Sequence, residues 1–155
     1  MSEFTAAPEF KAAMVAAAHT IWDAAEPDVQ ISYGHPGKTQ HPDIVGFSRV
    51  TSEQDPATLS TNRSREETLQ LVVTFSIYRF GGPEMEEVAT VRAYKLLGDL
   101  ENYVRKTDTT LGGVVRHCFL QTHESDGESD PNVLAQGRLI EVQATFQAQN
   151  RITTT

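Results

Sequence analysis

The most informative part of the chain is TLQLVVTFSIYRFGGP, residues 68–83. Over residues 68–80, apolar and polar side chains alternate with a period of two, which predicts a β-strand with one face in the core. The predicted core face carries Leu69, Leu71, Val73, Phe75 and Ile77, with Arg79 at its end. The opposite face is only half polar. Gly81 and Gly82 end the strand, and Pro83 suits the first turn of a following helix.

Comparable patterns on either side predict one more helix and four more strands. Apolar residues at three-to-four spacing predict helices at residues 7–25 and 83–106. Alternating or short apolar segments predict strands at residues 29–33, 44–51, 114–122 and 134–149. The order α-β-β-β-α-β-β predicts an α+β fold, in which a five-stranded mixed or antiparallel sheet packs against two helices and keeps one face open. We expect residues 1–155 to form a single domain with frayed ends at residues 1–6 and 150–155.

Composition and charge exclude several classes of protein. The 155-residue chain has a formal net charge of −8, so it lacks a general attraction for nucleic-acid phosphates or anionic membranes. Its single cysteine, Cys118, excludes an internal disulfide and argues against a multi-cysteine zinc site. The alanine-rich residues 1–22 include Glu9 and Lys11, and they have neither a basic leader nor an uninterrupted apolar span. We therefore expect a cytoplasmic protein that does not enter a membrane.

The sequence contains no recognised catalytic motif. The patterns GxxxxGK(S/T), GxGxxG and GxSxG are absent. His35 and His41 flank one loop, but no carboxylate or thiol cluster completes a metal site, so we interpret them as solvated loop histidines. His117 and Cys118 are neighbours on a predicted strand and point to opposite faces, which argues against a shared metal or a Cys–His nucleophile pair. We predict no catalytic residue, no metal and no cofactor.

Two polar segments are candidates for binding. Residues 124–132, ESDGESDPN, present carboxylates at alternating positions but lack the spacing of an EF-hand, which favours a solvated turn over a weak Ca²⁺ site. Residues 52–65 form a polar segment that is long for a connection in a small domain. Arg63 and Arg65 in this segment either contact a phosphate or an acidic partner, or belong to a solvated loop.

The order of the elements resembles that of a known family. An alanine-rich helix precedes a short strand that ends in ISYGHP, residues 31–36. A long apolar strand then leads into an amphipathic helix, and two strands close the chain. In this layout, which covers nearly the whole chain, the sequence resembles the tail terminator, or tail-completion, proteins of long-tailed bacteriophages with non-contractile tails.

The resemblance implies a structural role without catalysis or a cofactor. Members of the family are α/β domains that form a six-fold ring on the head-proximal end of the tail tube. The ring stops polymerisation of the tube and presents the docking surface for the head connector, and DNA passes through its hole. The implied partners are further copies of the chain, the major tail tube protein and the connector or stopper protein. The implied location is the head–tail junction of the virion, after assembly in the host cytoplasm.

Residues are assigned to these contacts as hypotheses. The loops at residues 34–43 and 52–65 supply the candidate partner contacts, which are Tyr33, Gly34, His35, Pro36, Lys38, His41, Pro56, Leu59, Arg63 and Arg65. Val72, Tyr78 and Phe80, on the less buried face of residues 68–80, are candidates for the subunit interface. The candidate lumen residues are Glu141, Gln143, Thr145 and Gln147. A polar face with almost no positive charge lets DNA pass without gripping it.

Three alternatives stay open at this point. A phage neck or head-closure protein also forms a ring, usually with another order of elements. A small enzyme with an unrecognised site would use histidines and acidic residues, for example as a hydrolase. A small binding or regulatory domain would act as a monomer or dimer.

Overall fold

The computed structural model describes residues 4–34, 41–57, 63–127 and 130–153. The elements are, in order, helix α1 (Ala7–Trp22), strands β1 (Val29–Ser32), β2 (Asp43–Pro56) and β3 (Arg65–Phe80), helix α2 (Glu84–Asn102), the π-helical turn η1 (Tyr103–Thr107), strand β4 (His117–Gly127), the short helix α3 (Pro131–Leu134) and strand β5 (Gly137–Ile152). The predicted α+β class and the five-stranded mixed sheet are confirmed. The order departs from the prediction by the two short helical segments, η1 and α3.

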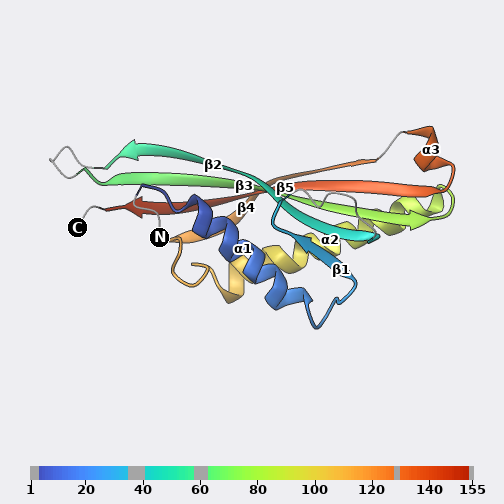
Figure 1. Cartoon of the computed structure of the whole chain (residues 1–155), viewed down its shortest axis with the longest axis horizontal. Coiled ribbons are helices and arrows are strands. Elements are labelled where there is room, and N and C mark those ends of the chain that lie inside the picture. The colour runs from blue at the N-terminus through green and yellow to red at the C-terminus, as the bar shows by residue number, and fades with distance from the viewer. Residues whose placement is uncertain (1–3, 35–40, 58–62, 128–129, 154–155) are drawn as a thin grey trace.

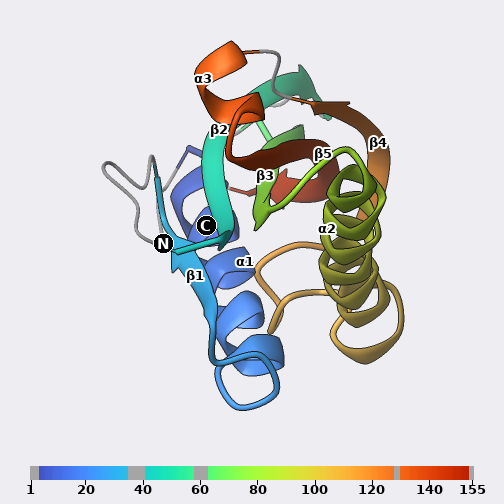
Figure 2. The ribbon, with the colours of Figure 1, turned by 90° about the vertical axis from the view of Figure 1, so that its right-hand side faces the viewer.

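The five strands form one twisted sheet in the order β1-β2-β3-β5-β4. β1 runs parallel to β2, and every other neighbouring pair is antiparallel. β3 and β5, each 16 residues long, pair along their whole length and form the centre of the sheet (Figure 1). Figure 2 looks along the strands and shows α1 and α2 on one side of the sheet and α3 on the other. The sheet therefore has one face covered by two helices and one largely open face.

The hydrophobic core lies between the sheet and helices α1 and α2. The predicted core residues of β3 are all buried, and those of β5 that face the same way are buried with them. From α1, the Trp22 ring meets the Phe75 ring edge to face, with the ring centroids 6.4 Å apart. Burial of one large apolar side chain contributes about 1.5–3 kcal/mol to stability. This layer therefore holds both helices on the same face of the sheet.

The prediction of a polar loop at residues 52–65 is wrong for its first part. β2 continues to Pro56, and β3 already begins at Arg65, so the two strands form a long hairpin. The side chains of Ser52 and Gln54 point to the helix side and donate hydrogen bonds to Glu67. Because these inward side chains are polar, the segment lacks the apolar alternation that identifies a strand in the sequence.

The prediction of frayed ends at residues 1–6 and 150–155 is wrong for the residues next to the core. Thr5 and Ala6 are buried, and both donate hydrogen bonds to the carboxylate of Glu67. At the other terminus, β5 extends to Ile152, which is buried and pairs with Arg65. Tertiary hydrogen bonds thus order both terminal segments, as happens when a terminus joins a sheet or docks on it.

Several other boundaries differ from the prediction, among them the end of α1, which lies at Trp22 instead of residue 25. α2 ends at Asn102 instead of residue 106, and η1 continues it. β4 spans His117–Gly127 instead of residues 114–122, so four residues of the predicted acidic turn are strand. Residue 134, predicted to begin the last strand, lies in α3, whose N-cap Asp130 accepts a hydrogen bond from the Asn132 backbone N–H.

Candidate interaction surface

The open face of the sheet is a long strip of mainly uncharged side chains. The strand register pairs Val72 with Thr145 and Thr74 with Gln143, which places candidate interface and lumen residues on the same face. Among the described residues of β3, this face carries no charged side chain between Glu66 and Phe80. On β5 it carries none between Glu141 and Arg151. Every predicted lumen residue lies on this strip, and the additional residues that share it are Thr68, Gln70, Ser76 and Gln149.

Amide and hydroxyl groups bond to one another across the strip. Gln70 Nε2 donates to Gln121 Oε1 at 2.8 Å, and Gln149 Nε2 donates to Thr68 Oγ1 at 3.0 Å. The first bond reaches across β5, from β3 to β4, and the second joins the neighbouring strands β5 and β3, so both satisfy polar groups of this face within the sheet. The strip can therefore lie against water or a polar surface without presenting a concentrated charge.

A shallow groove of about 1460 Å³ lies at one end of the open face. It is bounded by α3 on one side and by Gly34, His41 and Pro42 on the other, with β2, β3 and β5 as its floor. Tyr78 and Phe80 form part of its lining, and their rings meet edge to face with centroids 5.3 Å apart. Two of the three residues predicted for a subunit interface, Tyr78 and Phe80, therefore lie in the groove, and Val72 lies further along the same face.

Phe80 is the most exposed of the large hydrophobic side chains in the described chain, with 75% of its surface accessible. Its ring contributes apolar surface at the mouth of the groove, where Leu139 also contributes. An exposed aromatic side chain beside a half-buried one, in a concave site, is a common feature of protein-binding surfaces.

The two candidate partner-contact loops lie at opposite ends of the sheet. Gly34 and His41 flank the first loop, next to the level at which Asp43 pairs with Ile77. Ala57 and Arg63 flank the second loop, beyond the level at which Pro56 pairs with Arg65. The candidates His35, Pro36, Lys38 and Leu59 lie outside the described residues.

The remaining loop candidates are placed as follows. Tyr33 is about half exposed, and the Lys11 ammonium lies 4.3 Å from the centroid of its ring, a cation–π contact. Arg63 is exposed, as expected for a loop residue. Pro56 and Arg65 are not in the loop, because they form the last pair of the β2–β3 hairpin.

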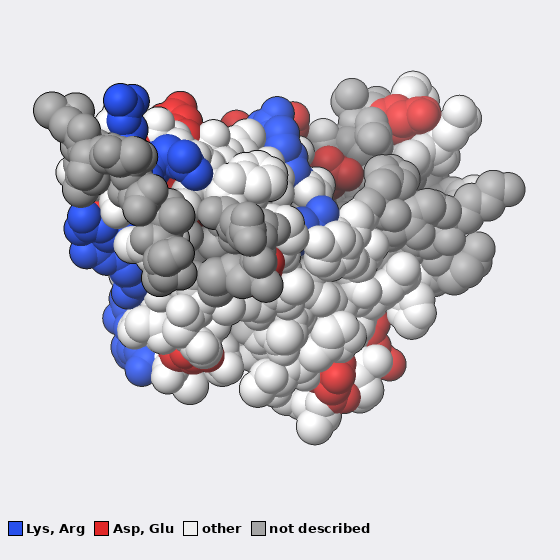
Figure 3. Space-filling view, turned by 60° about the vertical axis from the view of Figure 1, so that its left-hand side comes forward, with Lys and Arg blue, Asp and Glu red and all other residues white. Residues whose placement is uncertain are grey.

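The two ends of the sheet also differ in charge. Exposed arginines at positions 63, 116 and 151 lie at the end that carries the hairpin and both chain termini. Figure 3 brings this end of the molecule toward the viewer and shows several Lys and Arg side chains there. The opposite end carries the acidic first turn of α2, with Glu84, Glu86 and Glu87. The two ends therefore present different chemistry to their surroundings.

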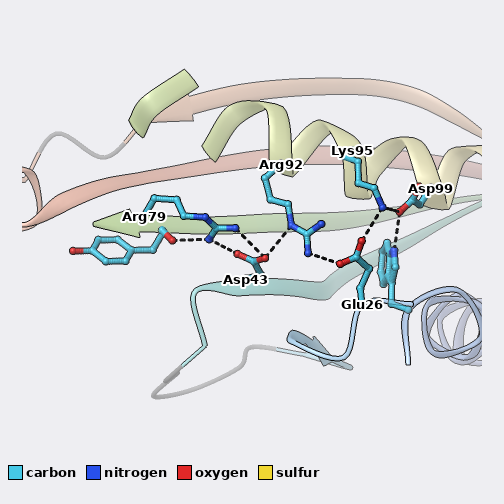
Figure 4. Close-up of polar contacts among 8 residues, drawn as sticks. Glu26, Asp43, Arg79, Arg92, Lys95 and Asp99 are labelled. Atoms are coloured by element: carbon cyan, nitrogen blue, oxygen red, sulfur yellow. Dashed lines mark hydrogen bonds and ion pairs between the residues drawn. The ribbon is translucent and has the colours of Figure 1, made fainter. Parts of the chain in front are cut away.

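A chain of ion pairs fixes the groove end of the sheet (Figure 4). Asp43, which is 4% exposed, accepts from Arg79 Nη1 at 2.5 Å and from Arg92 Nε at 3.0 Å. Arg92 also donates to Glu26 at 2.8 Å, and Lys95 donates to Glu26 at 2.8 Å. These ion pairs connect α2 to the start of β2 and to the segment before β1. They therefore fix the start of β2, which follows His41 and Pro42.

These contacts shift the acidity of both carboxyl groups. Burial acts to raise the pKa of Asp43, but the hydrogen bonds from Arg79 and Arg92 lower it below its ordinary value. The hydrogen bonds from Arg92 and Lys95 lower the pKa of Glu26 to about 2. Both groups are therefore ionised at neutral pH, and the ion pairs persist well into the acidic range.

A second polar cluster fixes the hairpin end of the sheet. The Glu67 carboxylate is completely buried and accepts hydrogen bonds from five groups. Its donors are the Thr5 hydroxyl, the Ala6 backbone N–H at 2.9 Å, the Ser52 hydroxyl at 2.6 Å, Gln54 Nε2 at 3.3 Å and Asn150 Nδ2 at 3.1 Å. Burial acts to raise the pKa of Glu67, but these hydrogen bonds hold it below its ordinary value. One carboxylate thus connects the N-terminal segment to β2, β3 and β5.

Neither polar cluster was identified from the sequence. For Glu67 a signal existed, because the residue has the same strand parity as Leu69 and Leu71 and so occupies a core position. The Asp43 cluster draws its members from four separate parts of the chain, so no local pattern reveals it.

The histidine and cysteine residues are arranged as the strand geometry predicts. His117 is exposed and stacks on Phe119, whereas Cys118 is buried on the opposite face. Burial raises the pKa of the Cys118 thiol to about 12, so the thiol is protonated at neutral pH and is a poor nucleophile. Tyr94 on α2 lies within hydrogen-bond distance of His123, with 3.1 Å between the hydroxyl and Nδ1. In the described residues, no group of three or more His, Cys, Asp and Glu side chains is placed to hold a metal.

No helix among the described residues is both long enough and apolar enough to cross a membrane. Comparison of the sequence with protein-family models and with curated proteins finds no match.

Proposed function

We propose that the chain is a structural ring subunit of a phage tail. In this role, copies of the chain close into a ring on the head-proximal end of the tail tube, stop its polymerisation and provide the docking surface for the head connector. The observation that carries the proposal is the open sheet face, which is long, uncovered by α1 and α2, and almost free of charge along its centre.

The open face suits the wall of a DNA conduit. Its central strands have 16 residues, which corresponds to about 50 Å at about 3.3 Å per residue. This length exceeds one turn of B-form DNA, about 34 Å. On β3 and β5, the part of this wall between Glu141 and Arg151 carries no Lys or Arg, so it makes no ion pairs with phosphates, releases no counterions there and holds the DNA weakly.

The placement of the candidate loops suits a protein with two different partners. The loop flanked by Gly34 and His41 and the hairpin flanked by Ala57 and Arg63 lie at opposite ends of the strands. In a ring whose axis runs along the strands, one loop faces the tail tube and the other faces the connector. The difference in charge between the two ends favours two chemically different partners.

The test is the mass of the purified protein in solution, alone and mixed with purified tail tube protein, followed by negative-stain imaging. We expect rings of about six subunits, or caps that lie on one end of each tube and limit its length. An unrelated acidic protein of similar size, mixed with the same tubes, serves as the control for nonspecific binding. A protein that stays monomeric and leaves tube lengths unchanged would contradict the proposal. Binding to the connector alone would instead favour a neck protein.

A further inference from the structure

The sheet has two free edges that differ in sequence. At one side, the outer edge of β4 is free along its 11 residues, since β4 is the last strand in the sheet. At the other side, β1 covers β2 only from Asp43 to Gly46. From Val50 to Pro56, β2 pairs with β3 on its inner edge, and on its outer edge the described part of the chain has no strand. Exposed strand edges carry unpaired N–H and C=O groups and readily pair with another chain.

The directions of the two edge strands allow one copy to join the next. Each neighbouring pair from β2 through β3 and β5 to β4 is antiparallel. Because there are three such pairs, β2 and β4 run in opposite directions. A second copy related by rotation about an axis along the strands therefore brings its β4 antiparallel to β2 of the first. The same contact repeats from copy to copy, which is the heterologous arrangement that closes into rings.

The strand register shows which residues lie at the same height on the two edges. Val50 pairs with Leu71, Leu71 with Phe146, and Phe146 with Leu120. By the same chain of pairs, Thr51 is level with Phe119, and Glu53 is level with His117. Two copies placed side by side without an offset therefore bring these residues of β2 and β4 together.

The side chains at these heights complement one another on both faces. On the core side, Val50 and Leu120 are both partly buried hydrophobic residues at the margin of the core, and each would cover the other. On the open side, the exposed Glu53 of β2 lies at the height of His117, and the exposed Arg116 directly precedes His117 in the chain. Opposite charges across neighbouring strands stabilise pairing.

The pairable segments also end at the same height. The register of β2 shifts between Phe47 and Val50, and that of β4 shifts between Leu120 and Thr122. Each shift marks a β-bulge, which bends the strand and interrupts its ladder of hydrogen bonds. Beyond the bulge of β2, β1 already occupies the edge. The two bulges are therefore level with each other when the two copies are placed side by side without an offset.

From these observations we infer that the partner of each edge is a second copy of this chain, with residues 116–120 of one copy pairing antiparallel with residues 50–54 of β2 of the next. This inference rests on the proposed ring for its closure, but the contact itself is defined by the two edges. It makes the sheets of neighbouring subunits continuous, and it places the open face of every subunit on the same side of the joined sheet.

Cysteine cross-linking tests the contact. In a Cys118→Ala background, the Thr51→Cys and Phe119→Cys replacements are both at exposed positions on the open face. Within one chain the two positions are three strand spacings apart, about 14 Å, which exceeds the reach of a disulfide, about 7 Å between Cα atoms. Any disulfide between them therefore joins two copies. We expect a ladder of covalent oligomers after mild oxidation of the protein bound to tube ends.

The matched control pairs Thr51→Cys with Glu124→Cys, which is also exposed on the open face but lies at the height of Gly46. We expect this pair to give no ladder. If the control pair cross-links and the Phe119 pair does not, the register is wrong and the inference is overturned. If rings form and tubes are capped but the Phe119 pair gives no ladder, the edge contact is overturned while the proposed function stands. A ladder without tube capping would support the edge contact and overturn the proposed function.

Charge reversal provides a second measurement that does not depend on oxidation. Arg116 directly precedes His117, which is level with Glu53, so Arg116→Glu places a further negative charge close to Glu53 of the next copy, and we expect it to lower the fraction of protein in rings at least fivefold. Glu53→Arg in the same chain restores an opposite pair, so the double variant should recover ring formation. Arg116 also pairs with Glu66 within its own chain, at 2.9 Å. Loss without recovery in the double variant would therefore assign the effect to that internal pair and overturn the contact.

Discussion

Replacing Glu67 with Gln should destabilise the protein by about 3 kcal/mol. A hydrogen bond to a charged acceptor contributes about 1.5–3 kcal/mol, and removal of one partner from a buried charged cluster costs about 3–5 kcal/mol. The Glu67 carboxylate accepts five hydrogen bonds in a completely buried position. The amide keeps one acceptor oxygen but turns an NH₂ group toward groups that are themselves donors. The expected loss in the free energy of unfolding is therefore larger than that for one hydrogen bond and smaller than that for the whole cluster.

Urea unfolding at pH 7 measures this change. With an m-value of about 2 kcal/mol per molar urea, a loss of about 3 kcal/mol lowers the unfolding midpoint by about 1.5 M. Glu53→Gln is the matched control, because Glu53 is exposed on β2 of the same hairpin and should change stability by less than about 0.5 kcal/mol. A midpoint for the Glu67 variant equal to that of the Glu53 variant would refute the assignment of Glu67 as the anchor of this end.

Three further predictions concern pH, the open face and the buried thiol. The folded-state pKa values of Glu26 and Asp43 are lowered, so their contribution to stability is complete above pH 5 and is lost as the pH falls toward 2. The urea midpoint should therefore fall between pH 6 and pH 3. In the Glu26→Gln variant, the midpoint should fall less over the same pH range. Replacing Gln143 and Gln147 together with Lys should leave the free energy of unfolding within about 0.5 kcal/mol of wild type but create measurable, salt-sensitive binding to duplex DNA, detected by fluorescence anisotropy at 50 and 200 mM salt. Cys118 should react with iodoacetamide at least a hundredfold more slowly in the native protein than in 6 M urea, as followed by mass spectrometry, because its thiol is buried and its pKa is raised.

The sequence predicted most reliably those elements whose burial is one-sided. The alternation in residues 68–80 and 140–149 arises because one face of β3 and β5 packs on α1 and α2 while the other faces outward. The same asymmetry made the open face predictable, since side-chain parity assigns Gln143 and Gln147 to it. Strand register across the sheet is not encoded in any local pattern. That Thr51 and Phe119 lie at the same position along the strands is therefore seen only in the structure.

The elements that were misassigned are those without an apolar face. Residues 52–56 and 124–127 belong to strands, but most of their side chains are exposed, and the inward ones in the first segment are polar. Hydrophobic periodicity detects burial against a core, so it does not detect a strand that is held by backbone pairing and by a buried carboxylate. The same reason explains why the hairpin was predicted as a loop and why Pro56 and Arg65 were assigned to it.

The positions of the two polar clusters follow from the open face itself. The two long helices cover only one face of the sheet, and the other face carries only the short helix α3. Glu67 lies near the start of β3, and Arg79, the partner of Asp43, lies near its end, about 40 Å away at about 3.3 Å per residue. Each cluster joins segments that are distant in the sequence, at a cost in desolvation that hydrogen bonds and ion pairs offset. Because the two candidate contact loops begin beside these clusters, the polar clusters position the loops without covering the open face.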